Sequence, residues 1–349
     1  MKIKSSLFGT RKACLQVLLP AVLILSCCSS EAAIQSIMSG SATAPVFLEC
    51  KAISATEIVF RFSEPVRMKS LYLDPSVEIL SYIEGEEILI TLSEALMEGA
   101  RIIADILVED GNRNTLNVLT PFRARNDRVP KLIINELRTE NSSTTRNIEF
   151  IEFVAKSAGN LGALRLFLAG HSITQPVYEF PPVEVQSGEY IVLHLRSVEG
   201  CVDETGNDLT LSGGTESCPE ARDLWVPGNA KLIHKTDVVY LVDQDDKIID
   251  AVLMSESAGP AWGKADLANA AGFLASQGAW FPRGTVSPPD AGSYALTPAD
   301  ALISTGTTAT RTINRDETLV ADGRPENWYI TATSNATPGK PNSLRRYVP

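Results

Sequence analysis

The chain has 349 residues, of which 42 are Asp or Glu and 31 are Lys or Arg, giving a formal net charge of −11 at pH 7. A chain of this length usually folds into more than one domain. The acidic balance argues against non-specific attraction to nucleic acid or to anionic lipid, because both require clustered basic residues. We therefore expect no nucleic-acid partner.

Residues 1–26 have the pattern of a cleaved signal peptide. Four basic residues precede the apolar run 15–25, which is too short to span a bilayer, since a spanning helix needs about 20 apolar residues. The run ends at Ser26-Cys27, which resembles the lipobox of bacterial lipoproteins. This resemblance implies that Cys27 carries the acyl chains, palmitate among them, of a membrane anchor; an ordinary secretory signal is the alternative. The small, polar residues 27–44 predict a flexible tether.

Residues 45–126 are predicted to form a small β-sandwich. Short runs of alternating apolar residues, each bounded by turn residues, cover Glu57–Phe62, Val77–Tyr82, Glu87–Leu92 and Arg101–Val108. Strands at a spacing of about 10 residues are typical of this fold. The stretch FSEPV, a later Glu-Gly before a strand and EDGNRN near the end also resemble bacterial immunoglobulin-like domains of envelope proteins. The basic stretch Phe122–Lys131 is the predicted link to the next domain.

Strand patterns resume at Leu132. They include LIINEL, IEFIEF, SGEYIVLHL and a hairpin over residues 236–253, and NWYI and TPGKPNS follow near the end. This order, with an Asp ending the hairpin and a late Trp before TPG-x-x-N, resembles the lamin-tail domain, an immunoglobulin-like β-sandwich also found in exported bacterial proteins. The resemblance spans residues 131–343. It implies structural signature roles for Asn135, Glu136, Glu152, Asp250, Trp328, Pro338, Gly339 and Asn342.

The expected fold class is therefore all-β, with two immunoglobulin-like sandwiches in tandem and a short helix in the second. Insertions at about residues 200–230 and 255–305 depart from the compact lamin-tail pattern. Apolar residues recur at helical spacing within Lys264–Gln277, which predicts the helix. Loops on a rigid sandwich often carry function. The insertions are thus candidate partner surfaces, with inert elaboration as the alternative.

The cysteines suggest a disulfide, because an exported protein enters an oxidising compartment. Cys201 and Cys218 bracket a polar, Gly- and Asp-rich segment with little else to hold it. A bridge that closes a loop of about 15 residues is worth roughly 3 kcal/mol. We predict a Cys201–Cys218 disulfide.

The sequence offers no familiar catalytic set. Its three histidines, His171, His194 and His234, are scattered, and H-E-x-x-H, G-x-S-x-G and P-loop patterns are absent. Glu136 and Glu152 are interpreted as hydrogen-bonding residues at a strand pair, in preference to an acid–base pair. We expect no enzymatic activity and no cofactor.

Two further sets of residues are candidate binding sites. Asp243, Asp245, Asp246 and Asp250 cluster the oxygen ligands that suit Ca²⁺, as do the acidic residues of 203–208. Asp is equally common in hairpin turns, so both interpretations stay open. Trp225 and Trp262 lie in predicted loops beside Pro and Gly, where they could form an exposed aromatic surface for a glycan or protein; buried packing is the default alternative for both. Trp280 and Trp328 are expected in the core.

These patterns together predict a non-enzymatic, lipid-anchored binding or scaffolding protein of the bacterial cell envelope, with a protein or glycan partner. Cys28 follows Cys27, so the Asp that retains many lipoproteins in the inner membrane is absent. This favours the outer membrane or the periplasmic face. The alternatives are a recognition subunit of an envelope hydrolase complex and a lipoprotein that binds Ca²⁺ or a small ligand.

Overall fold

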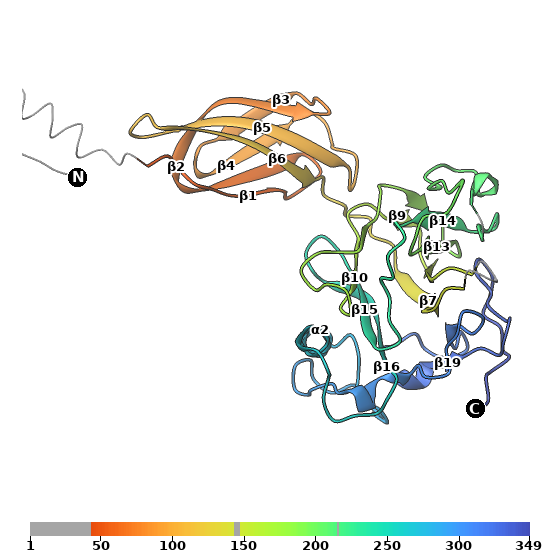
Figure 1. Ribbon diagram of the computed structural model, residues 1–349. Coiled ribbons are helices and arrows are strands. Elements are labelled where there is room, and N and C mark those ends of the chain that lie inside the picture. Colours follow the sequence, from red (N-terminus) through yellow and green to blue (C-terminus); the bar gives the residue numbers. More distant parts are fainter. Residues whose placement is uncertain (1–42, 143–146, 215) are drawn as a thin grey trace, which may run out of the picture. The chain divides into compact units, whose positions relative to one another are not determined.

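A computed structural model describes residues 43–142, 147–214 and 216–349, and Pro45–Pro349 form one compact unit (Figure 1). The described residues have an all-β fold with one α-helix, as predicted. The predicted signal peptide, the tether up to residue 42 and the lipidation site Cys27 lie outside the described residues. None of the helices in the described part of the chain combines the length and apolar character required to cross a membrane.

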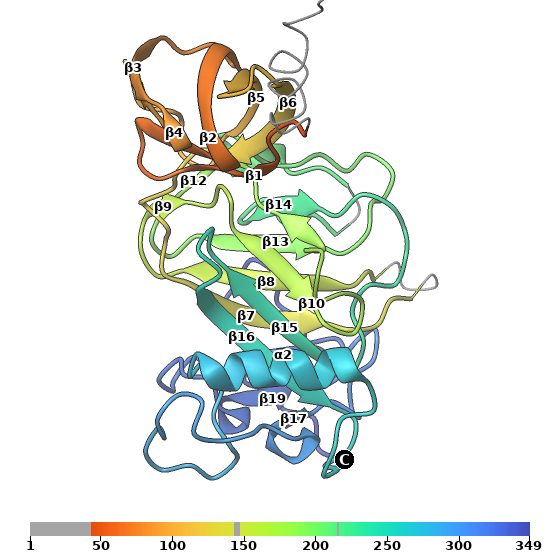
Figure 2. The ribbon, with the colours of Figure 1, turned by 90° about the vertical axis from the view of Figure 1, so that its left-hand side faces the viewer.

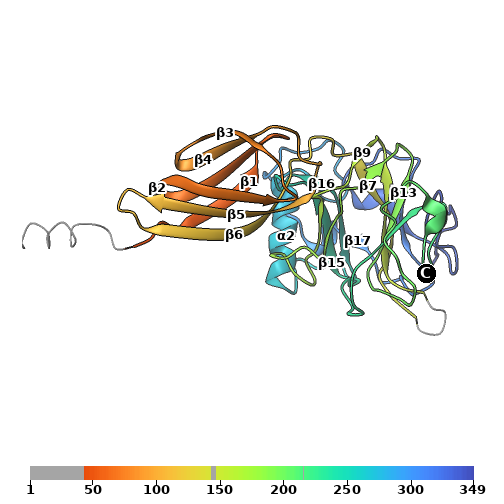
Figure 3. The same ribbon diagram turned by 90° about the horizontal axis from the view of Figure 1, so that it is seen from above.

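The N-terminal sandwich is a single six-stranded sheet folded into two layers. In the order β3-β4-β2-β5-β6, with β1 added to β2, its strands are all antiparallel. Figure 3 shows β3 and β4 on one side and β5 and β6 on the other. The strands are β1 (Phe47–Ala52), β2 (Glu57–Asp74), β3 (Ile79–Ile83), β4 (Gly85–Leu92), β5 (Arg101–Asp110) and β6 (Thr115–Arg123).

Strand β2 makes the fold possible because it belongs to both layers. Its first part pairs with β1 and β4, and its second part, from Val66 onward, pairs with β5. The pairing with β4 is interrupted between Arg61 and Val66, where Pro65 has no N–H to donate. The sequence predicted only residues 57–62 of this strand. The side chains of Phe60 and Phe62, together with the alternate residues of β4 and β5, fill the core between the layers.

The second region contains two larger sheets that share one hydrophobic core. One sheet has the order β14-β13-β8-β7-β18-β19, the other the order β11-β10-β15-β16-β17, and β9 and β12 form a separate pair. The strands are β7 (Leu132–Arg138), β8 (Phe150–Ala155), β9 (Gly159–Asn160), β10 (Arg165–Leu168), β11 (Tyr178–Glu179), β12 (Glu184–Val185), β13 (Tyr190–His194), β14 (Arg222–Trp225), β15 (Asp237–Val242), β16 (Ile248–Ser255), β17 (Leu302–Ile303), β18 (Ile313–Arg315) and β19 (Trp328–Ile330). Short 3₁₀ turns occupy η1 (Leu209–Leu211), η2 (Pro298–Asp300) and η3 (Pro325–Asn327).

Helix α2 (Ala265–Ser276) lies within one residue at each end of the predicted helix and crosses β15 and β16 (Figure 2). Its apolar face, formed by Leu267, Ala270, Ala271, Leu274 and Ala275, joins the main core. Phe273 packs edge-on against Tyr240 of β15, with ring centroids 5.7 Å apart. This cover explains why all six residues of β15 are buried, although strands of antiparallel sheets often have one solvated face.

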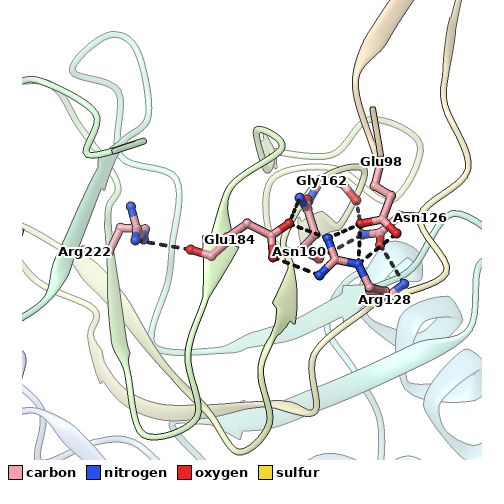
Figure 4. A network of polar contacts seen from close by, with 7 residues as sticks. All are labelled: Glu98, Asn126, Arg128, Asn160, Gly162, Glu184 and Arg222. Atoms are coloured by element: carbon pink, nitrogen blue, oxygen red, sulfur yellow. Dashed lines mark hydrogen bonds and ion pairs between the residues drawn. The ribbon is translucent and has the colours of Figure 1, made fainter. Parts of the chain in front are cut away.

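The predicted link after β6 is held by polar contacts on both sides (Figure 4). Arg128 donates to Glu98 of the N-terminal sandwich at 2.8 Å and to Glu184 of β12 at 2.6 Å. Asn126 donates from Nδ2 to the carbonyl oxygens of Asn160 and Gly162, both at 2.8 Å. These contacts give the polar residues of the link defined partners in the second region.

Candidate functional site

The most elaborate polar arrangement among the described residues joins Glu136 and Glu152, which lie opposite each other on β7 and β8. Both side chains are fully buried. The Oε1 atom of Glu152 accepts from Asn135 Nδ2 at 2.9 Å, and Oε2 accepts from the backbone N–H of Gly339 at 2.6 Å. Glu136 accepts from the backbone N–H of Thr337 at 3.0 Å. The two carboxyl groups thus hold the TPG turn against the strand pair.

The TPG turn has the backbone that its sequence requires. The N–H of Lys340 donates to the carbonyl of Thr337 at 3.0 Å, and Gly339 has φ +76°. A turn with Pro at its second position and a positive φ at its third is of type II, in which glycine is strongly preferred at the third position. Pro338 and Gly339 therefore shape the turn that presents its N–H groups to the two glutamates.

Asn342 extends this arrangement to a third strand. Its Nδ2 donates to the carbonyl of Arg315 at 2.8 Å and to the carbonyl of Asn135 at 3.1 Å, and its Oδ1 accepts from Asn314 at 2.8 Å. All four residues are at least nine-tenths buried. The C-terminal segment is thereby fixed to β7 and β18 in the interior.

Asp250 connects the two large sheets. From β16 its Oδ2 accepts from the backbone N–H of Ile134 on β7 at 2.7 Å and from Arg315 Nη2 on β18 at 2.5 Å. Arg315 also donates from Nε to the carbonyl of Ile134 at 2.7 Å, and its guanidinium lies 4.4 Å from the ring centre of Trp328. The structure therefore connects seven of the eight residues named by the resemblance through these contacts, and Pro338 shapes the turn that carries Gly339.

Burial controls the electrostatics of this network. It raises the pKa of Glu152 well above the ordinary value, and the neighbouring charge of Glu136 raises it further. Burial also raises the pKa of Glu136, although hydrogen bonds from Thr312 and Thr337 oppose the change. Because neither carboxyl group reaches solvent, their geometry serves to join chain segments and offers no access to a substrate.

The four aspartates considered for Ca²⁺ do not meet. Asp243 accepts from the backbone N–H groups of Asp245 and Lys247 at 2.9 and 3.0 Å, which is the turn-forming role. Asp245 pairs with Arg125, Asp246 pairs with Arg165, and Asp250 is in the buried network. Within residues 43–142, 147–214 and 216–349, no three His, Cys, Asp or Glu side chains are grouped to hold a metal ion. The structure therefore does not group the aspartates of this hairpin into a metal site.

The predicted disulfide is also absent from the structure, where Cys201 and Cys218 are both free thiols. Cys218 is buried, and its sulfur packs against the TPG turn: a Cβ atom on Gly339 would lie 2.4 Å from Cys218 Sγ. Cys201 is partly exposed. The loop is held instead by other contacts, among them Arg138, which donates from Nη1 to both carboxylate oxygens of Glu216 at 3.0 and 2.9 Å.

The predicted exposed aromatic surface of Trp225 and Trp262 is not formed. Trp225 lies on β14, is buried, and stacks on His194 with ring centroids 3.9 Å apart. His194 Nε2 forms a 2.7 Å contact with Asp223, so this histidine is a core residue. Trp262 is half-buried against the main core and donates to the carbonyl of Leu296 at 2.9 Å. Both tryptophans follow the buried-packing alternative, and Trp280 and Trp328 are in the core as expected.

A basic hollow is the feature that sequence reasoning missed. Its volume is about 660 Å³, and it is lined by Glu140, Lys231, His234, Lys235, Thr236, Glu256, Gly263, Lys264 and Leu267. Burial lowers the pKa of His234, and the nearby charges of Lys231 and Lys264 lower it further. Lys231 is paired with Glu140 at 2.9 Å. The lining residues come from three separate stretches of the sequence, so no local sequence motif predicted the hollow.

Comparison with known proteins adds the family of the second region. Residues 130–330 match the family model TP_1001_2nd, described as "protein second domain". A curated relative from Treponema pallidum (strain Nichols), named "Uncharacterized protein", is 25% identical over 194 residues. The match covers 52% of this chain and 48% of the relative, so the chain spans about half the length of that protein. Neither description names an enzymatic activity.

Two solved structures of the bacterial surface-layer protein SbsC are also similar. The N-terminal part of SbsC has 16% identity, covers 42% of this chain and 39% of its own, and has a TM-score of 0.24. Domains 1–6 have 12% identity, cover 65% and 42%, and have a TM-score of 0.23. At these scores the likeness supports no inference about function. The family match, in contrast, covers more than half of the 349 residues. The chain therefore belongs to the TP_1001_2nd family.

Proposed function

We propose that the chain is a non-enzymatic binding or scaffolding protein of a bacterial cell envelope, anchored by lipid on Cys27. An exposed face of the N-terminal sandwich that presents two large apolar side chains, one on each side of an aspartate, carries the proposal. Tyr72 of β2 lies opposite Asp105 of β5, which lies opposite Leu119 of β6, so the three residues form one row on the same face. Tyr72 is 70% exposed and Leu119 is 71% exposed. Exposed apolar residues that share a surface often mark interaction sites.

The polar residues of the second region support a scaffold. Glu136, Glu152 and Asp250, which offered acid–base or metal chemistry in the sequence, are all used to connect buried segments. Such a domain holds its surface loops on a fixed frame, as binding modules do. A protein or glycan of the envelope is the partner that this arrangement suits.

Cross-linking in intact bacterial cells tests the proposal. We expect the wild-type chain to form defined cross-links to an envelope component, and the double variant Tyr72→Lys/Leu119→Lys to lose most of them. Val286→Lys is the matched control, because Val286 is 93% exposed in the second insertion. Equal cross-linking by all three proteins would contradict a role for this face. Protease treatment of intact and gently opened cells would show on which side of the envelope the partner lies.

The basic hollow favours a second candidate function, which is binding of a small anionic ligand. Lys264 lies where α2 begins, and the N-terminal end of a helix favours negative charge. Lys235 also lines the hollow. We expect inorganic pyrophosphate to raise the melting temperature of the wild-type chain at low salt and to have no effect on Lys235→Gln/Lys264→Gln. Lys247→Gln, on the β15–β16 turn, is the control. An equal response of both lysine variants would exclude the hollow as the site.

A further inference from the structure

Strand β3 is an edge strand with an exposed apolar sequence. Its five residues, Ile-Leu-Ser-Tyr-Ile, pair with β4 and with no other strand of the described chain. Leu80 is 70% exposed, Tyr82 is 49% exposed and Ile83 is 67% exposed. Proteins usually protect such edges with Lys, Pro or inward-pointing charges, because an open edge pairs readily with another chain. Strand β3 itself contains none of these residues, and its one irregularity, of the kind that also protects edges, lies at its start, between Ile79 and Ser81.

The backbone of an edge strand supplies the affinity for a further strand. Alternate N–H and C=O groups of β3 face away from β4, because each antiparallel ladder uses only half of them. An extended peptide that joins such an edge gains main-chain hydrogen bonds, and its alternate side chains contact the exposed residues. Register with β4 shifts between Ile79 and Ser81 and is then regular through Ile83. The regular stretch therefore coincides with Tyr82 and Ile83, two of the exposed apolar residues.

The charges around β3 identify the kind of partner. Glu78 and Glu84 flank the strand at its two ends, and both are exposed. The Glu84 side chain accepts from the backbone N–H of Met68 on β2 at 2.8 Å, which holds this carboxylate at the β3–β4 turn. In a symmetric antiparallel pair of two copies centred on Ser81, Glu78 of one copy would face Glu84 of the other. Like charges directly opposite each other are destabilising, whereas opposite charges in the same positions are stabilising.

We propose that β3 binds an extended segment of another protein that has apolar or β-branched residues at its centre and Lys or Arg at both ends. The segment adds a seventh strand to the N-terminal sandwich. This inference rests on the proposed binding function and names the chemistry of its partner. The acidic ends of β3 disfavour a second copy of this chain as the occupant.

The test uses the whole chain and the fluorescein-labelled peptide Lys-Val-Thr-Val-Thr-Val-Lys with blocked ends. We expect saturable binding by fluorescence anisotropy, with slower amide hydrogen exchange in residues 79–83. The same peptide with Glu at both ends is expected to bind at least about 10-fold more weakly. A version with N-methyl groups at alternate backbone positions is expected not to bind, because it cannot complete the ladder. Leu80→Lys/Tyr82→Lys is expected to lose binding, and Val286→Lys to retain it.

Four outcomes would overturn the inference. Equal binding of the Lys-ended and Glu-ended peptides would show that charge does not select the partner. Binding of the N-methylated peptide as tight as that of the unmethylated one would show that the peptide does not add to the sheet as a strand. Dimerisation of the wild-type chain in sedimentation velocity that Leu80→Lys/Tyr82→Lys abolishes would make a second copy the occupant. If no peptide binds but the cross-links sensitive to Tyr72 and Leu119 persist in cells, the β3 inference fails while the proposed function stands.

Discussion

Replacement of Arg315 by methionine is expected to lower the free energy of unfolding by about 3–5 kcal/mol, the usual cost of breaking a buried ion pair by removing one partner. Arg315 is 1% exposed and donates to Asp250 and to the carbonyl of Ile134. Without it, the Asp250 carboxylate stays in the interior and keeps only backbone donors. Urea unfolding of the wild type and the variant measures the difference.

Two further variants separate the buried charge from lost packing. Arg315→Met/Asp250→Asn is expected to recover part of the lost stability, because neither charge of the pair remains buried. In the wild type Arg315 Nη1 is buried without a hydrogen-bond partner, so removing the whole pair costs less than removing one member. Lys340→Met removes an ion pair with Glu220 in which both side chains are 59% exposed, and is expected to leave the free energy of unfolding nearly unchanged. A loss below about 1 kcal/mol for Arg315→Met would show that the connection between the sheets is unimportant.

Stability is expected to fall as the pH rises from about 4.5 toward neutral, and Glu152→Gln is expected to reduce this fall. Burial and the charge of Glu136 raise the pKa of Glu152 in the folded state. A group with a raised pKa contributes stability that is fully present below its unfolded pKa and is lost as the pH passes its folded pKa. The free energies of unfolding of the two proteins should therefore diverge progressively across this pH range.

Urea unfolding at pH 4.5, 6 and 8 measures that divergence. The comparison isolates the Glu136–Glu152 pair, because other buried acids with raised pKa values, such as Asp237 at about 7, are the same in both proteins. Glu94→Gln, at an exposed position, is the control and should follow the wild type at every pH. Parallel curves for the wild type and Glu152→Gln would mean that the pair is already ionised when buried.

Local patterns of apolar residues in the sequence were sufficient to locate several strands and the helix. Alternation of apolar residues located β4 and β5, because successive side chains of a strand face opposite sides, and apolar runs bounded by polar turns located β7 and the β15–β16 hairpin. The spacing of apolar residues within 264–277 located α2 for the corresponding reason. The same patterns did not predict the full length of β2. This strand continues past Pro65 to Asp74, because its second part pairs with β5.

The predicted resemblance to the lamin-tail domain pointed to the residues of the buried network. It did not indicate which of them are in contact. Glu136 and Glu152 are 16 positions apart, and Asn342 lies far beyond both, so the register of β7 on β8 and the return of the C-terminal segment decide that they meet. The same is true of the basic hollow, whose lysines come from separate stretches.

The sequence by itself therefore determined the all-β class, the single helix and the position of most strands, because these follow from short-range periodicity. Only the tertiary structure decided which polar residues are buried together, that Trp225 stacks on His194, that Cys218 packs on Gly339 instead of bonding to Cys201, and that the aspartates of the β15–β16 turn pair with arginines. Those outcomes depend on which distant segments the sheets bring into contact, and the free energy of burying and pairing their side chains is set by that packing.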